Sequence, residues 1–157
     1  MAQTTGKVIC AGLGPGDPEL MSLKAARAIA AAHHVAYFRK AGREGQARRI
    51  VEGMLSPSAV EYPMEYPVTT EIHFSHPDYN RQMADFYDVW AEKLALLAGT
   101  ETVLVLCEGD PFFYGSLMHL WRRLSPLYPF EVIPGISGMS GAWTLAEAPI
   151  TWGDDVL

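Results

Sequence analysis

Cysteine is scarce in this chain, which has two among 157 residues, Cys10 and Cys107. Two cysteines cannot build the disulfide framework of a small secreted protein, and they lack the paired spacing of a zinc site. His73 and His76 lie in a polar stretch without a third ligand on a rigid element, so solvated loop residues are expected there. We therefore expect two buried free thiols, no metal, and a protein of the reducing cytoplasm.

Positive charge is also in short supply, with 12 Lys and Arg against 18 Asp and Glu and a net charge of −6. Nucleic-acid binding depends on cationic contacts to phosphate, so we expect no nucleic-acid partner. An acidic small molecule remains compatible with this charge because it needs only a local basic patch. Long apolar runs are lacking, both of bilayer-spanning length and of the kind in signal peptides, so we expect no membrane partner.

Apolar residues are plentiful, at 49% of the chain, which is enough to bury the core of one domain. Short β-branched runs alternate with segments of helical spacing, and this alternation favours a parallel sheet with helices on both faces. We predict a doubly wound α/β fold with a mostly parallel five-stranded sheet. The expected strands are residues 7–11, 35–38, 60–64, 102–107 and 130–133. The expected helices are residues 22–32, 46–54, 78–98 and 116–124, with a last one ending near 147. Helical spacing places Leu23, Ala26 and Ile29 or Ala30 on the inner face of the first helix, and Leu117, Leu120, Trp121 and Leu124 on that of the fourth.

Three glycine-rich loops follow the first, fourth and fifth predicted strands, at residues 12–16, 108–114 and 135–138. Right-handed crossovers place all three at the carboxyl edge of the sheet, where open α/β folds bind ligands. Asp110 adds a carboxylate directly after the most apolar strand. An acid beside exposed backbone groups suits a ribose or a positively charged small molecule better than a phosphate.

The first of these loops invites a dinucleotide interpretation, which fails in two places. The sixth position of the motif, which should be glycine, is Asp17, and the second strand ends in Tyr37, Phe38 and Arg39 rather than an acid. The chain also has no phosphate-binding loop with Gly-Lys-Ser or Gly-Lys-Thr. A purely structural turn is the remaining alternative for this loop taken alone.

Four stretches together resemble a known family, the tetrapyrrole (corrin/porphyrin) methylases, and most closely its precorrin-2 C-20 methyltransferase subgroup. They read GLGPGDPEL from residue 12, EGDPFFYG from 108, VIPGIS from 132 and APITWGDD from 148. The resemblance implies an S-adenosylmethionine-dependent enzyme of cobalamin biosynthesis that methylates the meso carbon C-20 of precorrin-2. It also implies a homodimer of two-domain subunits that binds cofactor and tetrapyrrole in the cleft between the domains.

The resemblance also assigns roles to individual residues. The expected cofactor-binding residues are Pro15, Glu108, Gly109, Asp110, Phe113, Ser137 and Gly138. The expected substrate-binding residues of the first loop are Gly14, Pro15 and Gly16. Two alternatives stay open, since Asp110 is also a plausible turn cap and the aromatic residues 112 and 113 are also plausible core residues.

A basic cluster lies beside the end of the second predicted strand. It contains five of the 12 basic residues, namely Arg39, Lys40, Arg43, Arg48 and Arg49. We expect all five to supply cationic contacts to carboxylates of the substrate, with Arg39, Lys40 and Arg43 as the foremost candidates and a solvated helix face as the alternative. Some relatives carry an aspartate at the end of this strand that is thought to handle protons, but Phe38 stands there, so no catalytic base is assigned.

The chain is expected to comprise an α/β domain over residues 1–147 and, over residues 148–157, a linker into a second domain that is largely absent. A chain of this extent is expected to be inactive alone. Two alternatives to the precorrin-2 assignment remain. One is another methylase of the same fold, acting on uroporphyrinogen III, a later precorrin, a protein or ribosomal RNA. The other is a non-catalytic module that binds a nucleotide or a tetrapyrrole.

Overall fold

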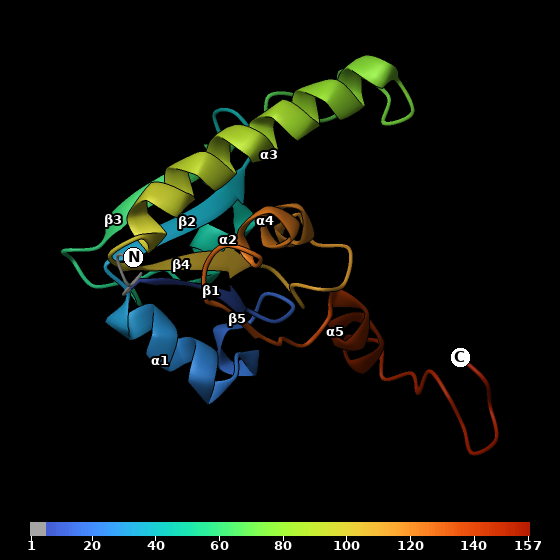
Figure 1. Cartoon of the computed structure of the whole chain (residues 1–157). Helices are drawn as coiled ribbons and strands as arrows, with labels where there is room; N and C mark the ends of the chain where they lie inside the picture. The colour runs from blue at the N-terminus through green and yellow to red at the C-terminus, as the bar shows by residue number, and fades with distance from the viewer. Residues whose placement is uncertain (1–5) are drawn as a thin grey trace.

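The computed structural model describes residues 6–157, which form a five-stranded parallel sheet covered by helices on both faces (Figure 1). The strands are β1 (Lys7–Gly12), β2 (His34–Arg39), β3 (Val60–Glu65), β4 (Thr102–Cys107) and β5 (Phe130–Ile133). Their spatial order is β3-β2-β4-β1-β5, and every pair of neighbours is parallel. The predicted doubly wound α/β fold is therefore confirmed.

The helices are α1 (Leu23–Ala31), α2 (Gln46–Ile50), α3 (Pro77–Ala98), α4 (Leu117–Leu124) and α5 (Gly138–Leu145), with a short 3-10 turn at Pro18–Leu20. Ser22 begins α1 by accepting a hydrogen bond from the Ala25 amide, as an N-cap serine should. Ser137 caps α5 in the same way through the Ser140 amide.

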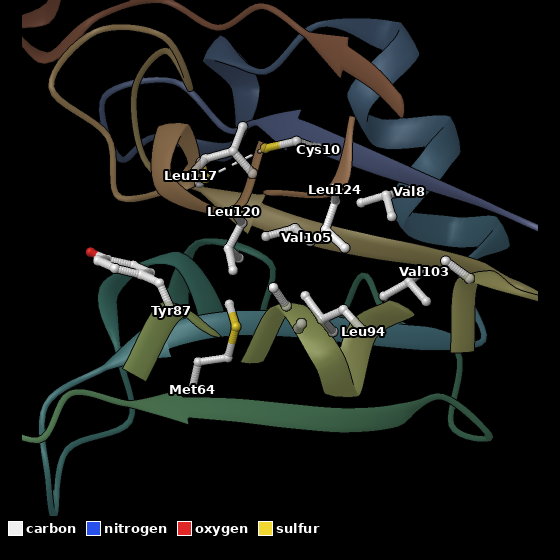
Figure 2. Close-up of a cluster of buried hydrophobic side chains, with 14 of the residues drawn as sticks. Val8, Cys10, Met64, Tyr87, Leu94, Val103, Val105, Leu117, Leu120 and Leu124 are labelled. Atoms are coloured by element: carbon white, nitrogen blue, oxygen red, sulfur yellow. Dashed lines mark hydrogen bonds between the residues drawn. The ribbon is translucent and has the colours of Figure 1, made fainter. Parts of the chain in front are cut away.

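The central strand β4 is apolar because both of its faces are covered, as parallel strands in such folds usually are. On one face, α3 and α4 cover a cluster that includes Leu94, Leu117 and Leu120, and Figure 2 shows α4 side chains meeting Val105 of β4. On the other face, α1 and α2 cover a second cluster. Because helices cover both faces, the ends of the strands are the open part of the sheet.

The two cysteines lie in the first cluster as buried free thiols, as predicted, with their sulfur atoms 3.5 Å apart. Burial, followed by the contact with Cys107, raises the pKa of the Cys10 thiol. The Cys10 thiol is therefore a protonated core group at neutral pH.

Three local predictions are wrong. Leu23 was expected on the inner face of α1 but is 75% exposed, because the helix packs through Ala25 and Ile29 instead. The helix after Gly45 ends at Ile50 rather than at residue 54, and a turn follows it. Trp121 was expected inside but lies at the surface, where its ring meets that of Phe112 edge-on.

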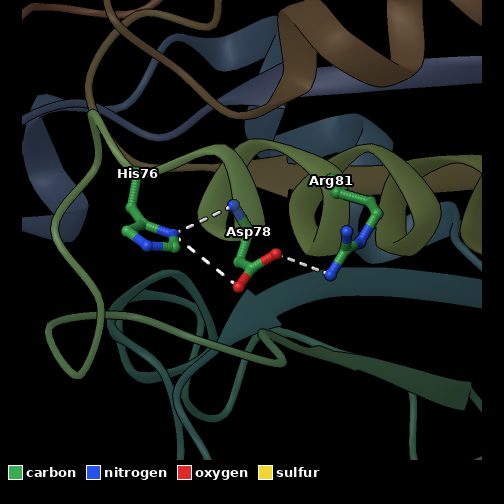
Figure 3. Close-up of polar contacts among 3 residues, drawn as sticks. All are labelled: His76, Asp78 and Arg81. Carbon is green, nitrogen blue, oxygen red and sulfur yellow. Dashed lines mark hydrogen bonds and ion pairs between the residues drawn. The ribbon is translucent and has the colours of Figure 1, made fainter.

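The amino-terminal end of α3 extends away from the sheet and carries His76 and Asp78 (Figure 1). Figure 3 shows that His76 caps this helix, because its Nδ1 accepts a hydrogen bond from the Asp78 amide at 3.1 Å. The Asp78 carboxylate in turn pairs with Arg81. Within residues 6–157 the structure has no cluster of three or more His, Cys, Asp or Glu side chains suited to a metal. None of the helices in that range combines the length and apolar character needed to cross a bilayer.

Candidate functional site at the carboxyl edge of the sheet

The three glycine-rich loops meet above the ends of β1, β4 and β5, as predicted. Gly14 and Gly109 exchange two backbone hydrogen bonds, at 3.3 Å from the Gly14 amide and 2.8 Å from the Gly109 amide. Both residues have positive φ, at 78° and 59°, a region that favours glycine. The loops after β1 and β4 are therefore joined by the backbone alone.

The loop after β5 approaches the loops after β1 and β4 so closely that a side chain would not fit at Gly135 or Gly12. A Cβ added to Gly135 would lie 2.1 Å from the Gly109 carbonyl oxygen, and one added to Gly12 would lie 2.7 Å from the Gly135 amide nitrogen. We call this arrangement of Gly12, Gly14, Gly109 and Gly135 the glycine edge. Its glycines are needed for close packing between backbones.

Asp110 ties the glycine edge together with its side chain. One carboxylate oxygen accepts the Phe112 amide at 2.9 Å, and the other accepts the Gly135 amide at 3.1 Å. The turn-capping role weighed for this residue is therefore present, and it is combined with a link between two loops. The carboxylate still places negative charge at the edge where a cationic ligand was expected.

A cavity of about 640 Å³ opens beside the glycine edge, between the first loop and α5. Its wall includes Pro15 and Leu20 from the first loop and Ile136, Gly138 and Leu145 from the segment after β5. Pro15 packs directly on α5, because a Cβ on Gly141 would lie 2.6 Å from the Pro15 Cβ. Two predicted cofactor residues, Pro15 and Gly138, thus lie in one cavity.

The other residues predicted for the site lie in different settings. Ser137 uses its hydroxyl to cap α5. Phe112 and Phe113 are 48% and 46% exposed, so the alternative that they are core residues is wrong. Gly16, predicted to contact substrate, has open space where a Cβ would be. The first loop therefore presents an uncrowded backbone at this point.

A second cavity, of about 710 Å³, lies at the ends of β2 and β4, and we call it the basic cavity. Its lining includes Arg39, Lys40, Arg43, Arg49, Tyr66 and Glu108. The structure thus places four of the five cations expected to contact substrate in one cavity. Arg48, the fifth member of the basic cluster, is absent from this lining and pairs with Glu52 and Glu61.

The cations of the basic cavity differ in how much of their charge is already paired. Arg39 pairs with Glu65 at 3.1 Å. Among the residues that the structure describes, Lys40, Arg43 and Arg49 form no ion pair. Three cations are therefore available to an acidic ligand.

An aromatic wall, formed by Phe38 and Tyr66, lines the same cavity, and no motif in the sequence indicates it. The rings of Phe38 and Tyr66 stack with centroids 5.5 Å apart, and the Tyr66 hydroxyl lies 2.6 Å from the Ser116 Oγ. Burial raises the pKa of Tyr66, so its hydroxyl stays neutral. Only the sheet order could have brought Tyr66 to Ser116, which is 50 positions further along the chain.

Comparison with known proteins decides the family. The pattern that defines the Tetrapyrrole (Corrin/Porphyrin) Methylases matches residues 7–157. The chain belongs to this family. The resemblance based on the four motifs is thus confirmed, and with it the fold class.

Two curated tetrapyrrole methylase relatives and one solved structure illustrate the similarity. The chain is 55% identical to a precorrin-2 C(20)-methyltransferase of Sinorhizobium sp over 97% of its own length and 62% of the relative's. It is 43% identical to the cobalamin biosynthesis protein CobIJ of Mycobacterium tuberculosis over 93% and 29% of the two lengths. The crystal structure of uroporphyrin-III-C-methyltransferase from Thermus thermophilus matches at 25% identity, with a TM-score of 0.59, over 94% and 55% of the two chains. The chain therefore spans less than two thirds of each.

Proposed function

We propose that this chain is the cofactor-binding part of an S-adenosylmethionine-dependent methyltransferase that methylates C-20 of precorrin-2 in cobalamin biosynthesis. The observation that carries the proposal is the basic cavity, whose Lys40, Arg43 and Arg49 form no ion pair within residues 6–157. This cavity adjoins the glycine edge, because Glu108 lines it and the next residue is Gly109. The name of the 55%-identical relative supports the choice of substrate within the family. The second cobalamin biosynthesis relative supports the same pathway.

The residues present at the glycine edge fit S-adenosylmethionine, which supplies an electrophilic methyl group on a sulfonium. The cofactor is cationic at the sulfur, and Asp110 and Glu108 give this edge negative charge. Pro15, Ile136 and Gly138 would hold the apolar parts of the cofactor in the 640 Å³ cavity. The exposed ring of Phe113 follows Asp110 by three residues in the chain. Ser137 and Gly109 would contribute mainly by fixing the loops around it.

The basic cavity would hold the acidic side chains of the tetrapyrrole. Lys40, Arg43 and Arg49 can each bind a carboxylate, and the stacked rings of Phe38 and Tyr66 offer a flat apolar surface to a macrocycle. In the first loop, Gly14 and Gly16 would let the substrate approach the backbone. The meso carbon is already electron-rich, so the protein's contribution is alignment and exclusion of water.

We further propose that residues 1–147 form one domain and that residues 148–157 lead into a second α/β domain which completes the cleft. The support is a set of exposed apolar side chains within residues 136–152, where Leu145 is 88% exposed and Ile136, Met139 and Trp152 are also exposed. An apolar surface of this kind calls for a covering partner. We also propose that the protein is a cytoplasmic homodimer and that its function requires neither nucleic acid nor a membrane.

The test compares this chain with a longer protein in which it is followed by the unmatched part of the Sinorhizobium relative, hereafter the joined protein. Both are incubated with precorrin-2 and S-adenosylmethionine, and the position of the new methyl group is read by NMR. We expect C-20 methylation by the joined protein and at least tenfold slower turnover by the chain alone, because one wall neither aligns the reactants nor excludes water.

Three results would contradict parts of this proposal. Turnover by the chain alone within tenfold of the joined protein would refute the need for a second domain. Methylation of uroporphyrinogen III in preference to precorrin-2 would favour another methylase of the same fold. Calorimetric binding of S-adenosylmethionine without any methyl transfer by the joined protein would favour a non-catalytic binding module.

A further inference from the structure

Glu108 occupies the junction between the two halves of the candidate site. It follows β4, the strand in the middle of the sheet, and it lines the basic cavity. The next residue, Gly109, is part of the glycine edge through its two hydrogen bonds to Gly14. The Glu108 side chain is therefore the acidic group closest in the chain to both the proposed cofactor edge and the proposed substrate cavity.

Three carboxylates around the site are engaged by partners, whereas Glu108 is not. Glu65 pairs with Arg39, Glu61 with Arg48, and Asp110 accepts two backbone amides. Within residues 6–157 no hydrogen bond or ion pair involves the Glu108 carboxylate. Partial desolvation by the surrounding protein raises the pKa of Glu108, which makes its carboxylate a stronger proton acceptor.

The remaining groups of the basic cavity are poor proton acceptors. Phe38, at the end of β2, has no titratable group. Tyr66 is held neutral by burial and bonded to Ser116. The lysine and the arginines offer hydrogen-bond donors and no acceptor. Glu44 also lines the cavity, but it lies on the loop between β2 and α2, whereas Glu108 directly precedes Gly109 of the glycine edge.

We propose that Glu108 is a catalytic residue, the base that removes the proton from the methylated meso carbon. The inference rests on the proposed function. After methylation, the meso carbon carries both the new methyl group and its original hydrogen, and the macrocycle carries one extra positive charge. A Glu108 carboxylate oxygen forms a bond to that hydrogen, the C–H bond breaks, and its electron pair returns to the conjugated ring. The products are neutral glutamic acid and a macrocycle with its conjugation restored.

The test uses the joined protein with Glu108→Gln, Glu108→Asp and Glu44→Gln. The first readout is single-turnover methylation with precorrin-2 carrying hydrogen or deuterium at C-20. The second readout needs no cofactor and measures the loss of C-20 deuterium from bound precorrin-2 into water. In this exchange, protonated Glu108 adds a proton to C-20, and the resulting carboxylate removes the deuteron. Affinities for precorrin-2 and S-adenosylmethionine are measured by calorimetry.

We expect Glu108→Gln to slow methylation about 10²- to 10⁴-fold, the range for loss of a general base. Its deuterium loss should slow at least tenfold, its isotope effect should increase, and its affinity for precorrin-2 should not fall. Glu108→Asp should restore part of both rates. Glu44→Gln removes the same charge from the same cavity and should not slow deuterium loss.

Two outcomes overturn the assignment of Glu108 alone. One is normal methylation and deuterium loss in Glu108→Gln, and the other is equal slowing by Glu44→Gln, which would make the effect one of cavity charge. Failure of the unmutated joined protein to methylate precorrin-2 would instead overturn the proposed function, and the role of Glu108 with it.

Discussion

The glycine edge is held together by backbone contacts, whereas the basic cavity beside it is lined by side chains. In the edge, Gly14 and Gly109 bond to each other, and Gly135 lies against the Gly109 carbonyl. In the cavity, Lys40 and Arg43 project from a loop and form no ion pair within the described part of the chain. One region is fixed before any ligand arrives, and the other can adjust.

This difference matches what the two proposed ligands require. A small cofactor whose methyl group must point in one direction benefits from a rigid surface, since misplacement by about 1 Å costs rate. A tetrapyrrole with several carboxylates can be held by long, mobile cations that need only complementary charge. Variants of the edge should therefore affect folding, and variants of the cavity should affect substrate binding alone.

The largest effect is expected from Gly135→Ala, because its Cβ would lie 2.1 Å from a backbone oxygen that cannot easily move. Overpacking of this kind costs about 1–3 kcal/mol of unfolding free energy. Gly138→Ala is the matched control, since its Cβ meets no atom within 4 Å. Urea unfolding of both variants measures the difference. Equal stability of the two would show that the edge is not rigid.

Asp110→Ala should lower the unfolding free energy by about 1–3 kcal/mol, because two backbone amides lose a charged acceptor. If the carboxylate also contacts the cofactor, calorimetric affinity for S-adenosylmethionine should fall by a similar free energy. Asp110→Asn keeps the shape and one acceptor and should lose less stability. Lost stability with unchanged affinity would limit Asp110 to its loop-tying role.

Neutralising the unpaired cations should weaken substrate binding without changing stability. We expect Lys40→Ala and Arg43→Ala in the joined protein each to raise the KM for precorrin-2 about threefold, as exposed ionic contacts contribute about 0.2–1 kcal/mol. Their KM should also depend less on salt. Arg39→Ala should have a smaller effect because Glu65 already pairs with it. An unchanged KM and salt response would place the tetrapyrrole elsewhere.

The smallest effect should have the opposite sign. Glu65→Gln removes the partner of Arg39 and adds a fourth available cation to the basic cavity. We expect the KM for precorrin-2 to fall about twofold at low salt, with no change at high salt, where surface charges are screened. The double variant Glu65→Gln with Arg39→Ala should cancel the gain. A gain that persists in the double variant would mean that Arg39 is not its source.

Much of the site could be predicted because its signals are local. The glycine-rich loops follow apolar strands, and parallel strands send such loops to one edge. The basic cluster is compact in sequence, so Arg39, Lys40 and Arg43 could be expected to share a surface. The aromatic wall could not be predicted, because Tyr66 follows β3 and meets Ser116, which follows β4, only through the order β3-β2-β4 in the sheet.

The sequence by itself determined the alternation of strands and helices, the caps at Ser22 and Ser137, and the three loops of the glycine edge, because these depend on residues within a few positions of one another. The tertiary structure alone decided that α1 packs through Ala25 rather than Leu23 and that Asp110 binds an amide 25 positions away. It also decided which cations are paired and which are available. Such contacts depend on how distant strands pair and helices dock, and that information is spread over the whole chain.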